Sequence, residues 1–381
     1  MSALLPTYQR HNIELVEGTG SFVKDTQGIT YLDFMMGIAV CNTGHRHPYV
    51  EQRLKEQLGQ LWHTSNLFES SKQERVATLL TENSHLSHAF FCNSGTEANE
   101  GAFKLIRKWT QKTEILSFSQ SFHGRTFAMM GATGQEKVKE GFGEMVADFK
   151  HLVFNDLSSL DAITEKTGAV WLEIIQGEGG VIVADDAWLE ALMKRTKAYG
   201  VKIVVDEVQT GIGRTGSRFA FEQTPLKPDI ITVAKGLGSG FPVGAIITTA
   251  EAATIFTPGT HGSTFGGNPL AMTAAEATLD LLLTDELLHE VQEKGNYLMR
   301  RLAAELPETS LHSVRGRGLM IGIEFERPVA GIVQALQQVG MLVVSAGPHV
   351  VRLLPSLFVT RQELDLALEK IKQVCQQEVM V

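Results

Sequence analysis

Short apolar runs alternate with amphipathic stretches through the central part of the chain. The runs are rich in β-branched residues and predict buried strands at His88–Cys92, Glu114–Phe118, Ala169–Ile175, Lys202–Val205, Ile230–Ala234 and Gly244–Thr248. Apolar residues at helical spacing fill most of the intervals, as in Ala187–Tyr199. This alternation, from about residue 72 to 250, predicts an α/β fold with a mostly parallel sheet and helices on both faces.

The pattern changes toward both ends of the chain. Ser21–Lys24 and Ile29–Asp33 predict a hairpin, and Pro48 begins a helix whose apolar face is predicted to comprise Val50, Leu54 and Leu58. A long helix is predicted over Leu270–Glu305, with a break near Thr284–Asp285. After residue 307 the predicted elements are short strands at His312–Val314, Leu319–Phe325, Leu342–Val344 and Val350–Leu353, and helices at Val329–Val339 and Arg361–Gln376.

These changes predict a domain organisation. Residues 51–285 would form a large domain, and 286–381 a smaller α+β domain. Residues 1–50 would pack with the small domain, so that both chain ends build it.

Two predicted strands lead directly into side chains that can take part in catalysis. The run Lys202–Val205 leads into Asp206, and the run Ile230–Ala234 leads into Lys235. Ligands of open α/β sheets bind at the carboxyl ends of the strands, so an acid and a lysine placed there are candidates for catalysis. Pyridoxal phosphate (PLP) chemistry needs this pair: a lysine forms the Schiff base, and an aspartate keeps the pyridine nitrogen protonated. The alternative is that Lys235 begins a solvated loop and Asp206 caps a turn.

A third strand end indicates an anion site. The run ending at Cys92 is followed by Asn93-Ser94-Gly95-Thr96-Glu97, and then by a predicted helix. Hydroxyls and backbone N–H groups at the positive end of a helix can bind phosphate. The alternative is that Ser94 or Thr96 only caps the helix.

Other candidates follow later strands. Phe122 can stack on a planar cofactor, and Arg125 can bind a carboxylate through both guanidinium arms. Glu178 lies on a glycine-flanked loop after another strand. Arg352 lies in an apolar strand and, if buried, needs an anion, which is either a structural partner or a substrate carboxylate. A second polar, glycine-rich loop occupies residues 258–269.

One motif points to a different class. Gly211, Gly213 and Gly216 match G-x-G-x-x-G after a strand, as in nicotinamide-dependent oxidoreductases. However, five residues separate the apolar run from Gly211, and Asp229 precedes the next apolar run instead of following it. The oxidoreductase is therefore the remote alternative.

Composition narrows the function classes. The 381 residues are 43% hydrophobic and 20% charged, and the formal net charge is −9, which argues against nucleic acid or an anionic membrane as the main partner. Nothing resembles a signal peptide or a membrane span, so a cytoplasmic location is expected. Cys41, Cys92 and Cys375 are expected to be free thiols. His45 and His47 have no further ligands at metal-site spacing, so no metal is expected.

The motifs taken together resemble the class III, fold-type I, PLP-dependent aminotransferases. The resemblance rests on NSGTEANE (93–100), SFHGRT (121–126), QGEGGV (176–181), DEVQTGIGRTG (206–216), TVAKGLGSGFPVGA (232–245), HGSTFGGNPLA (261–271) and VRLLPSL (351–357). They stand in family order and span most of the chain. The resemblance implies a seven-stranded sheet in the large, PLP-binding domain.

The resemblance also implies how the cofactor would be bound. Lys235 would form the Schiff base and then move the proton, and Asp206 would hold the pyridinium proton. Gln209 would bond the ring hydroxyl, and Phe122 would stack on the ring. Ser94, Gly95 and Thr96 would bind the phosphate. Thr264, with Ser263 beside it, would reach the phosphate of a neighbouring subunit, which makes the active unit a homodimer.

The substrate residues are implied in the same way. Arg352 would bind the α-carboxylate of glutamate and 2-oxoglutarate, and Arg125 the carboxylate at the far end of each substrate. Glu178 would pair with Arg352 when an ω-amine substrate is bound. The resemblance is closest to family members that convert N2-acetyl-L-ornithine and 2-oxoglutarate into N-acetyl-L-glutamate 5-semialdehyde and L-glutamate in arginine biosynthesis, by a ping-pong cycle through pyridoxamine phosphate.

Other substrates remain open. Ile38 stands where ornithine-specific relatives carry a tyrosine, which argues against free ornithine. An aliphatic residue there also suits γ-aminobutyrate, and succinylornithine or succinyldiaminopimelate are further alternatives.

Overall fold

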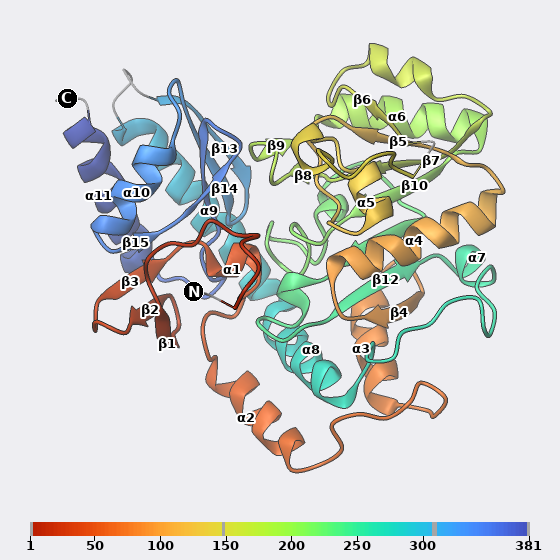
Figure 1. Ribbon diagram of the computed structural model, residues 1–381, viewed down its shortest axis with the longest axis horizontal. Coiled ribbons are helices and arrows are strands. Elements are labelled where there is room, and N and C mark those ends of the chain that lie inside the picture. Colours follow the sequence, from red (N-terminus) through yellow and green to blue (C-terminus); the bar gives the residue numbers. More distant parts are fainter. Residues whose placement is uncertain (1–2, 147–148, 307–310, 379–381) are drawn as a thin grey trace.

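The computed structural model describes residues 3–146, 149–306 and 311–378, so the extreme ends of the predicted terminal segments lie outside it. Among the described residues, seven strands form one twisted sheet in the order β4-β12-β11-β10-β7-β5-β6 (Figure 1). They are β4 (His88–Cys92), β5 (Glu114–Phe118), β6 (Phe149–Leu152), β7 (Thr167–Leu172), β10 (Lys202–Asp206), β11 (Ile230–Val233) and β12 (Gly244–Thr248). Strand β12 is antiparallel to both of its neighbours, β11 and β4, and the other six strands run in one direction. The predicted fold, a mostly parallel sheet of fold type I, is confirmed.

Helices cover both faces of this sheet because its strands are apolar on both sides. Val204 of β10 packs on one face with α4 (Gly95–Thr110) and α5 (Phe127–Ala132). Val205, one residue later, packs on the other face with α3, α6 and α8. These helices span Ser71–Thr81, Asp186–Tyr199 and Pro269–Leu282, and short α7 spans Ala250–Ala253.

A second sheet contains the arginine predicted to bind substrate. Its antiparallel strands lie in the order β13-β14-β17-β16, with bounds β13 (Leu311–Arg317), β14 (Met320–Phe325), β16 (Val344–Ala346) and β17 (Val350–Leu353). Arg352 of β17 is fully buried and pairs with Gly322 of β14. The helices of this region are α9 (Asp285–Glu305), α10 (Ala330–Gln338) and α11 (Arg361–Glu378).

The N-terminal strands join this C-terminal region, and Figure 1 shows them beside its helices. The strands β1 (Leu15–Thr19), β2 (Phe22–Asp25) and β3 (Thr30–Asp33) form a sheet that is extended by β15 (Met341–Leu342). The β3–β15 pairing is parallel and unites segments about 310 residues apart. Short α1 (Met36–Ala39) follows β3. The boundaries 1–50, 51–285 and 286–381 remain a proposal.

The structure corrects one predicted surface. Helix α2 (Pro48–Leu58) begins at the predicted proline, but Leu58, expected on its apolar face, is 49% exposed. Gln57 is buried in its place. Its Nε2 donates to Leu61 O at 2.7 Å, and its Oε1 accepts from Thr273 of α8 at 3.3 Å. Hydrogen bonding therefore compensates for a polar side chain on the buried face.

Several short elements were not predicted. They are β1, edge strand β6, helices α3 and α5, and the hairpin of β8 (Ile175–Gln176) and β9 (Ile182–Val183). Within the ranges that the structure describes, four short 3₁₀ turns also occur, at Glu136–Val138, Ser158–Ala162, Ala220–Gln223 and Lys235–Leu237. The predicted break in the long helix is confirmed, because α8 ends at Leu282 and α9 begins at Asp285. None of the helices in the described ranges combines the length and the apolar character needed to cross a membrane.

Candidate active site

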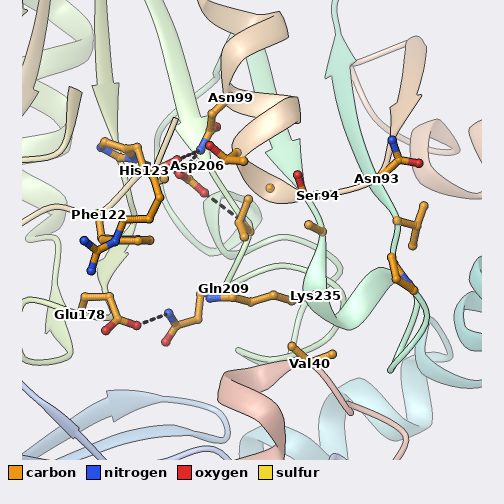
Figure 2. Close-up of a pocket in the computed structure, with 18 of the residues that line it drawn as sticks. Val40, Asn93, Ser94, Asn99, Phe122, His123, Glu178, Asp206, Gln209 and Lys235 are labelled. Atoms are coloured by element: carbon orange, nitrogen blue, oxygen red, sulfur yellow. Dashed lines mark hydrogen bonds and ion pairs between the residues drawn. The ribbon is translucent and has the colours of Figure 1, made fainter. Parts of the chain in front are cut away.

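A cavity of about 430 Å³ opens at the carboxyl edge of the large sheet. Strands β10 and β11 are parallel and in register, with Asp206 opposite Thr232, so Asp206 and the Lys235 loop lie at the same edge. The predicted residues that line the cavity are Ser94, Gly95, Thr96, Phe122, Arg125, Glu178, Asp206, Gln209 and Lys235. Figure 2 shows Asp206 grouped with Asn99 and His123, and Glu178 beside Gln209 in another part of the cavity.

Lys235 adopts an uncommon backbone conformation. Its φ is +43°, and it begins the 3₁₀ turn that follows β11. A side chain held in the left-handed region costs of order 1–3 kcal/mol, and such strain is concentrated at functional sites. Burial lowers the pKa of the Lys235 amine, although the carboxylates of Glu178 and Asp206 oppose this shift. A larger fraction of the amine is therefore neutral and nucleophilic.

Asp206 is buried and fixed by three donors. Its Oδ2 accepts from Asn99 Nδ2 at 2.8 Å and lies 2.8 Å from His123 Nδ1, and its Oδ1 accepts from Val208 N at 3.0 Å. Asn99 is held in turn by Thr232, whose hydroxyl donates to Asn99 Oδ1 at 2.6 Å. This network holds a carboxylate in one orientation, as is required to bond a protonated ring nitrogen.

The start of α4, where an anion site was predicted, lies at the cavity. Ser94 is the N-cap, and its hydroxyl accepts from Glu97 N at 3.3 Å, so the capping role is present. The first helical residues, Gly95 and Thr96, face the cavity. A Cβ on Gly95 would lie 2.7 Å from Val208, so no side chain fits there. The free N–H groups at this helix end can bind an anionic group of a ligand.

The aromatic candidate is positioned by a buried carboxyl. Phe122 N donates to Glu173 Oε2 at 3.1 Å, and the Arg125 guanidinium carbon lies 5.8 Å from the Phe122 ring centroid. Burial raises the pKa of Glu173 well above its ordinary value, and the charge of Asp206 acts in the same direction. Arg125 is exposed at the mouth, where an incoming carboxylate can reach it.

Arg352 and Glu178 form an ion pair beside the cavity. Arg352 Nη1 donates to Glu178 Oε1 at 2.7 Å and to Gln209 Oε1 at 2.8 Å. Burial raises the pKa of Glu178, but the Arg352 charge outweighs it and holds that pKa below its ordinary value. Within the described part of the chain, the buried Nε and Nη2 of Arg352 have no hydrogen-bond partner. These N–H groups leave the guanidinium able to accept a further anion.

Three predicted residues lie elsewhere. Ser263 and Thr264 line a separate cavity of about 780 Å³. Ser263 still approaches the first site, because its Oγ accepts from Asn93 Nδ2 at 3.3 Å. Ile38 is half-buried and does not line the 430 Å³ cavity, whereas Val40 of the same segment does. Their assigned roles remain predictions.

The glycine motif serves the fold. Gly211, Gly213 and Gly216 do not line the cavity. Arg214 between them is fully buried; its Nη1 donates to the carbonyls of Leu319 at 3.1 Å and Pro355 at 2.6 Å. The loop therefore connects the large sheet to the C-terminal region.

Sequence reasoning did not assign roles to Asn99, His123 and Glu173. Asn99 and His123 lie inside quoted motifs and Glu173 lies within the predicted strand Ala169–Ile175, but their partners are distant in sequence. His45 Nε2 lies 2.8 Å from Asp33 Oδ2. No group of three or more potential metal ligands is present within the described ranges. Among the described residues, no disulfide bond joins Cys41, Cys92 or Cys375.

Comparisons with known proteins agree with this geometry. The sequence model described as aminotransferase class-III matches residues 6–375. The acetylornithine aminotransferase of Bacillus cereus is 52% identical over 383 residues, which covers 100% of this chain and 99% of the relative.

Solved structures give the same result. The N-acetylornithine aminotransferase of Stenotrophomonas maltophilia K279a matches with a TM-score of 0.86 and 34% identity, over 98% of each chain. An ornithine aminotransferase from Toxoplasma gondii, with partial occupancy of PLP at its active site, matches with a TM-score of 0.94 and 28% identity, over 98% of this chain and 92% of that one. This chain belongs to the class-III aminotransferase family.

Proposed function

We propose that this chain converts N2-acetyl-L-ornithine and 2-oxoglutarate into N-acetyl-L-glutamate 5-semialdehyde and L-glutamate, with PLP as cofactor. The observation that carries the proposal is the ion pair between buried Arg352 and half-buried Glu178, because Glu178 lines the cavity that also contains Lys235. Full-length similarity to the Bacillus cereus relative supports the choice of amine. The product aldehyde and glutamate would belong to arginine biosynthesis.

The cavity fits the proposed cofactor. Gly95 and Thr96 would bind the phosphate, Phe122 would cover the ring, and Asp206 would bond the ring nitrogen. Gln209 would bond the ring hydroxyl. When bound, PLP supplies the electron sink that lets the amino group leave one carbon and join another. The glycine at position 95, where a side chain would collide with Val208, supports the phosphate assignment.

Lys235 would perform the proton transfer. Its Nζ would hold the cofactor covalently between turnovers and be released when a substrate amine arrives. The freed Nζ would take the proton from the substrate carbon that bears the amine and deliver it to the carbon on the other side of the amine nitrogen. The lowered pKa of Lys235 supports this role, because a base must be unprotonated to accept a proton.

Two arginines would orient both substrates. Arg352 would bind the α-carboxylate of glutamate or 2-oxoglutarate, and Arg125 would bind the carboxylate at the far end. The ω-amine end of acetylornithine carries no carboxylate, so Glu178 would stay paired with Arg352 while that substrate is bound. One cavity can then accept two different ends because its positive charge is masked or free.

We also propose that two copies of the chain form the active unit, with Thr264 reaching the partner's phosphate. An apolar surface beside Thr264 supports this. It comprises Leu61, Trp62, Leu67, Phe68 and Phe265, which are 60–91% exposed. Asn66 Nδ2 donates to Ser263 O at 3.0 Å, so this segment lies against the Ser263–Thr264 loop. Such a patch is typical of an interface. Sedimentation of the holoenzyme as a monomer would contradict the proposal.

A single-turnover absorbance experiment tests the reaction. The purified yellow holoenzyme is mixed with N-acetylornithine and no keto acid. Loss of the yellow absorbance much faster than with ornithine, γ-aminobutyrate or the succinylated amines supports the proposal. If the yellow absorbance is lost only with another amine, the chain is still an aminotransferase, but the proposed amine substrate is wrong. A protein that neither contains nor takes up PLP would overturn the proposed cofactor.

A further inference from the structure

The loop that carries Glu178 is held by two different parts of the molecule. It connects β8 to β9, which pair with Gln176 opposite Ile182. At its start, Gly177 N donates to Glu173 Oε1 at 3.4 Å, and Glu173 directly follows β7 of the large sheet. At its far end the contacts come from the C-terminal sheet. Glu178 therefore stands on a bridge between the two regions.

The far end of this bridge is strained. Val181 is fully buried and has a φ of +55°, in the left-handed region that a β-branched side chain rarely adopts. Such a conformation persists only when its surroundings enforce it. One part of those surroundings is Gly322, where an added Cβ would lie 2.8 Å from the Val181 Cβ. Gly322 also pairs with Arg352, so Val181 sits against the sheet that positions the arginine.

Arg315 supplies the polar part of this restraint. Its Nη2 and Nε donate to Gly180 O at 2.7 and 3.1 Å, and its Nε also donates to Val181 O at 3.2 Å. Arg315 lies on β13, 134 residues from Val181. A guanidinium has its donors in a rigid fork, so it fixes two successive carbonyls in one geometry.

Arg315 is itself oriented. Its Nη1 donates to Ser313 Oγ at 2.7 Å and to the carboxylate of Glu324, whose Oε2 also accepts from Ser313. All three guanidinium nitrogens are therefore engaged. Arg315 does not line the 430 Å³ cavity, so its influence on substrate must pass through the loop.

We propose that Arg315 is a positioning residue that sets how fully Glu178 occupies Arg352, and thereby the preference between the two substrates. The inference rests on the proposed function, because masking of Arg352 matters only if one substrate end lacks a carboxylate. Without the Arg315 fork, the strained Val181 backbone can relax and displace Glu178. Arg352 is then unmasked more often, which disfavours the amine donor and leaves glutamate binding intact.

The test is the ratio of two half-reactions, measured by single turnover as the apparent second-order rate constant with N-acetylornithine divided by that with glutamate. Arg315→Met is expected to lower this ratio by about 5- to 30-fold, the range of typical couplings between sites. Arg315→Lys keeps the charge without the fork and should fall between Arg315→Met and wild type. His312→Ala is the matched control, because His312 lies on β13 and approaches Glu324 at 3.8 Å without contacting the loop. Its ratio should not change.

Specific outcomes separate the hypotheses. Equal changes in both half-reactions of Arg315→Met, or no change, would overturn the role of Arg315. If that variant fails to fold, Glu324→Gln is the substitute: a smaller decrease in the ratio supports the role, and an unchanged ratio overturns it. A changed ratio in Glu178→Gln with an unchanged ratio in Arg315→Met leaves the proposed function standing and rejects the inference. Inability of wild type to use acetylornithine contradicts the proposed function alone, because the ratio can then be measured with the amine that reacts.

Discussion

The two ends of the cavity differ in how completely their polar groups are paired. At the Asp206 end, the carboxylate accepts from Asn99, His123 and Val208, and Asn99 is fixed by Thr232. At the Arg352 end, two buried nitrogens have no partner in the described structure, and the Glu178 loop ends on the strained Val181. A complete network suits a group that stays bound, whereas an incomplete one suits ligands that alternate.

Replacing Lys235 should have the largest effect, because both half-reactions depend on its amine. Lys235→Ala removes the amine that would hold the cofactor and move the proton, and the overall rate should fall by about 10⁴-fold or more. Steady-state assays with N-acetylornithine and 2-oxoglutarate measure this. Lys202→Ala is the matched control, because Lys202 lies on β10 without lining the cavity. A Lys235→Ala variant with more than a few per cent of wild-type rate would contradict the assignment.

The negative charge at the Asp206 end of the cavity gives the second prediction. Asp206→Asn keeps the shape but removes the negative charge that would hold the ring-nitrogen proton. We expect both half-reactions to slow by about 10²- to 10³-fold, as for loss of one transition-state electrostatic partner. Single-turnover traces with each substrate measure the two rates. Selective slowing of one half-reaction would show that Asp206 acts on a substrate instead of the cofactor.

Replacing Glu178 tests the Arg352 end of the cavity and should slow the two half-reactions unequally. Glu178→Gln leaves Arg352 without its counter-charge, so the half-reaction with N-acetylornithine should slow about 5- to 30-fold more than that with glutamate. The same single-turnover ratio reports it. Equal losses would mean that Glu178 supports the cavity without discriminating between substrates.

The sequence predicted the candidate reactive side chains at both ends of the cavity better than the contacts that position them. Lys235 and Asp206 were found because each follows a β-branched run, and the strand ends of a parallel sheet meet at one edge. Asn99 and His123 were not assigned, because their contacts with Asp206 span 107 and 83 residues. Arg315 is likewise defined by carbonyls 134 and 135 residues away, for which sequence has no local signal.

The fold shows the same limit. Strands Glu114–Phe118 and Gly244–Thr248 were predicted with their observed bounds because their apolar runs are buried on both faces. Strand β6 was missed because Phe149-Lys-His-Leu152 mixes polar and apolar residues at the sheet edge, where only β5 pairs with it. Strands β8 and β9 have two residues each, too few for a periodic pattern.

The smallest effect on activity is expected from the carboxyl next to Asp206. Glu207 does not line the cavity; its carboxylate accepts from Ala220 N at 3.0 Å and Phe221 N at 2.8 Å. Burial raises the pKa of Glu207 to about 7, from 4.5. A raised folded-state pKa means that the native protein binds the proton more tightly, so its stabilising contribution is complete below about pH 4.5 and is lost as the pH rises through about 7.

Glu207→Gln cannot titrate, so the Tm difference between variant and wild type should shift in the variant's favour from about pH 5 to 8. Parallel Tm curves over this range would contradict the buried, protonated state of Glu207, and kcat should stay within about twofold because the side chain does not face the substrate.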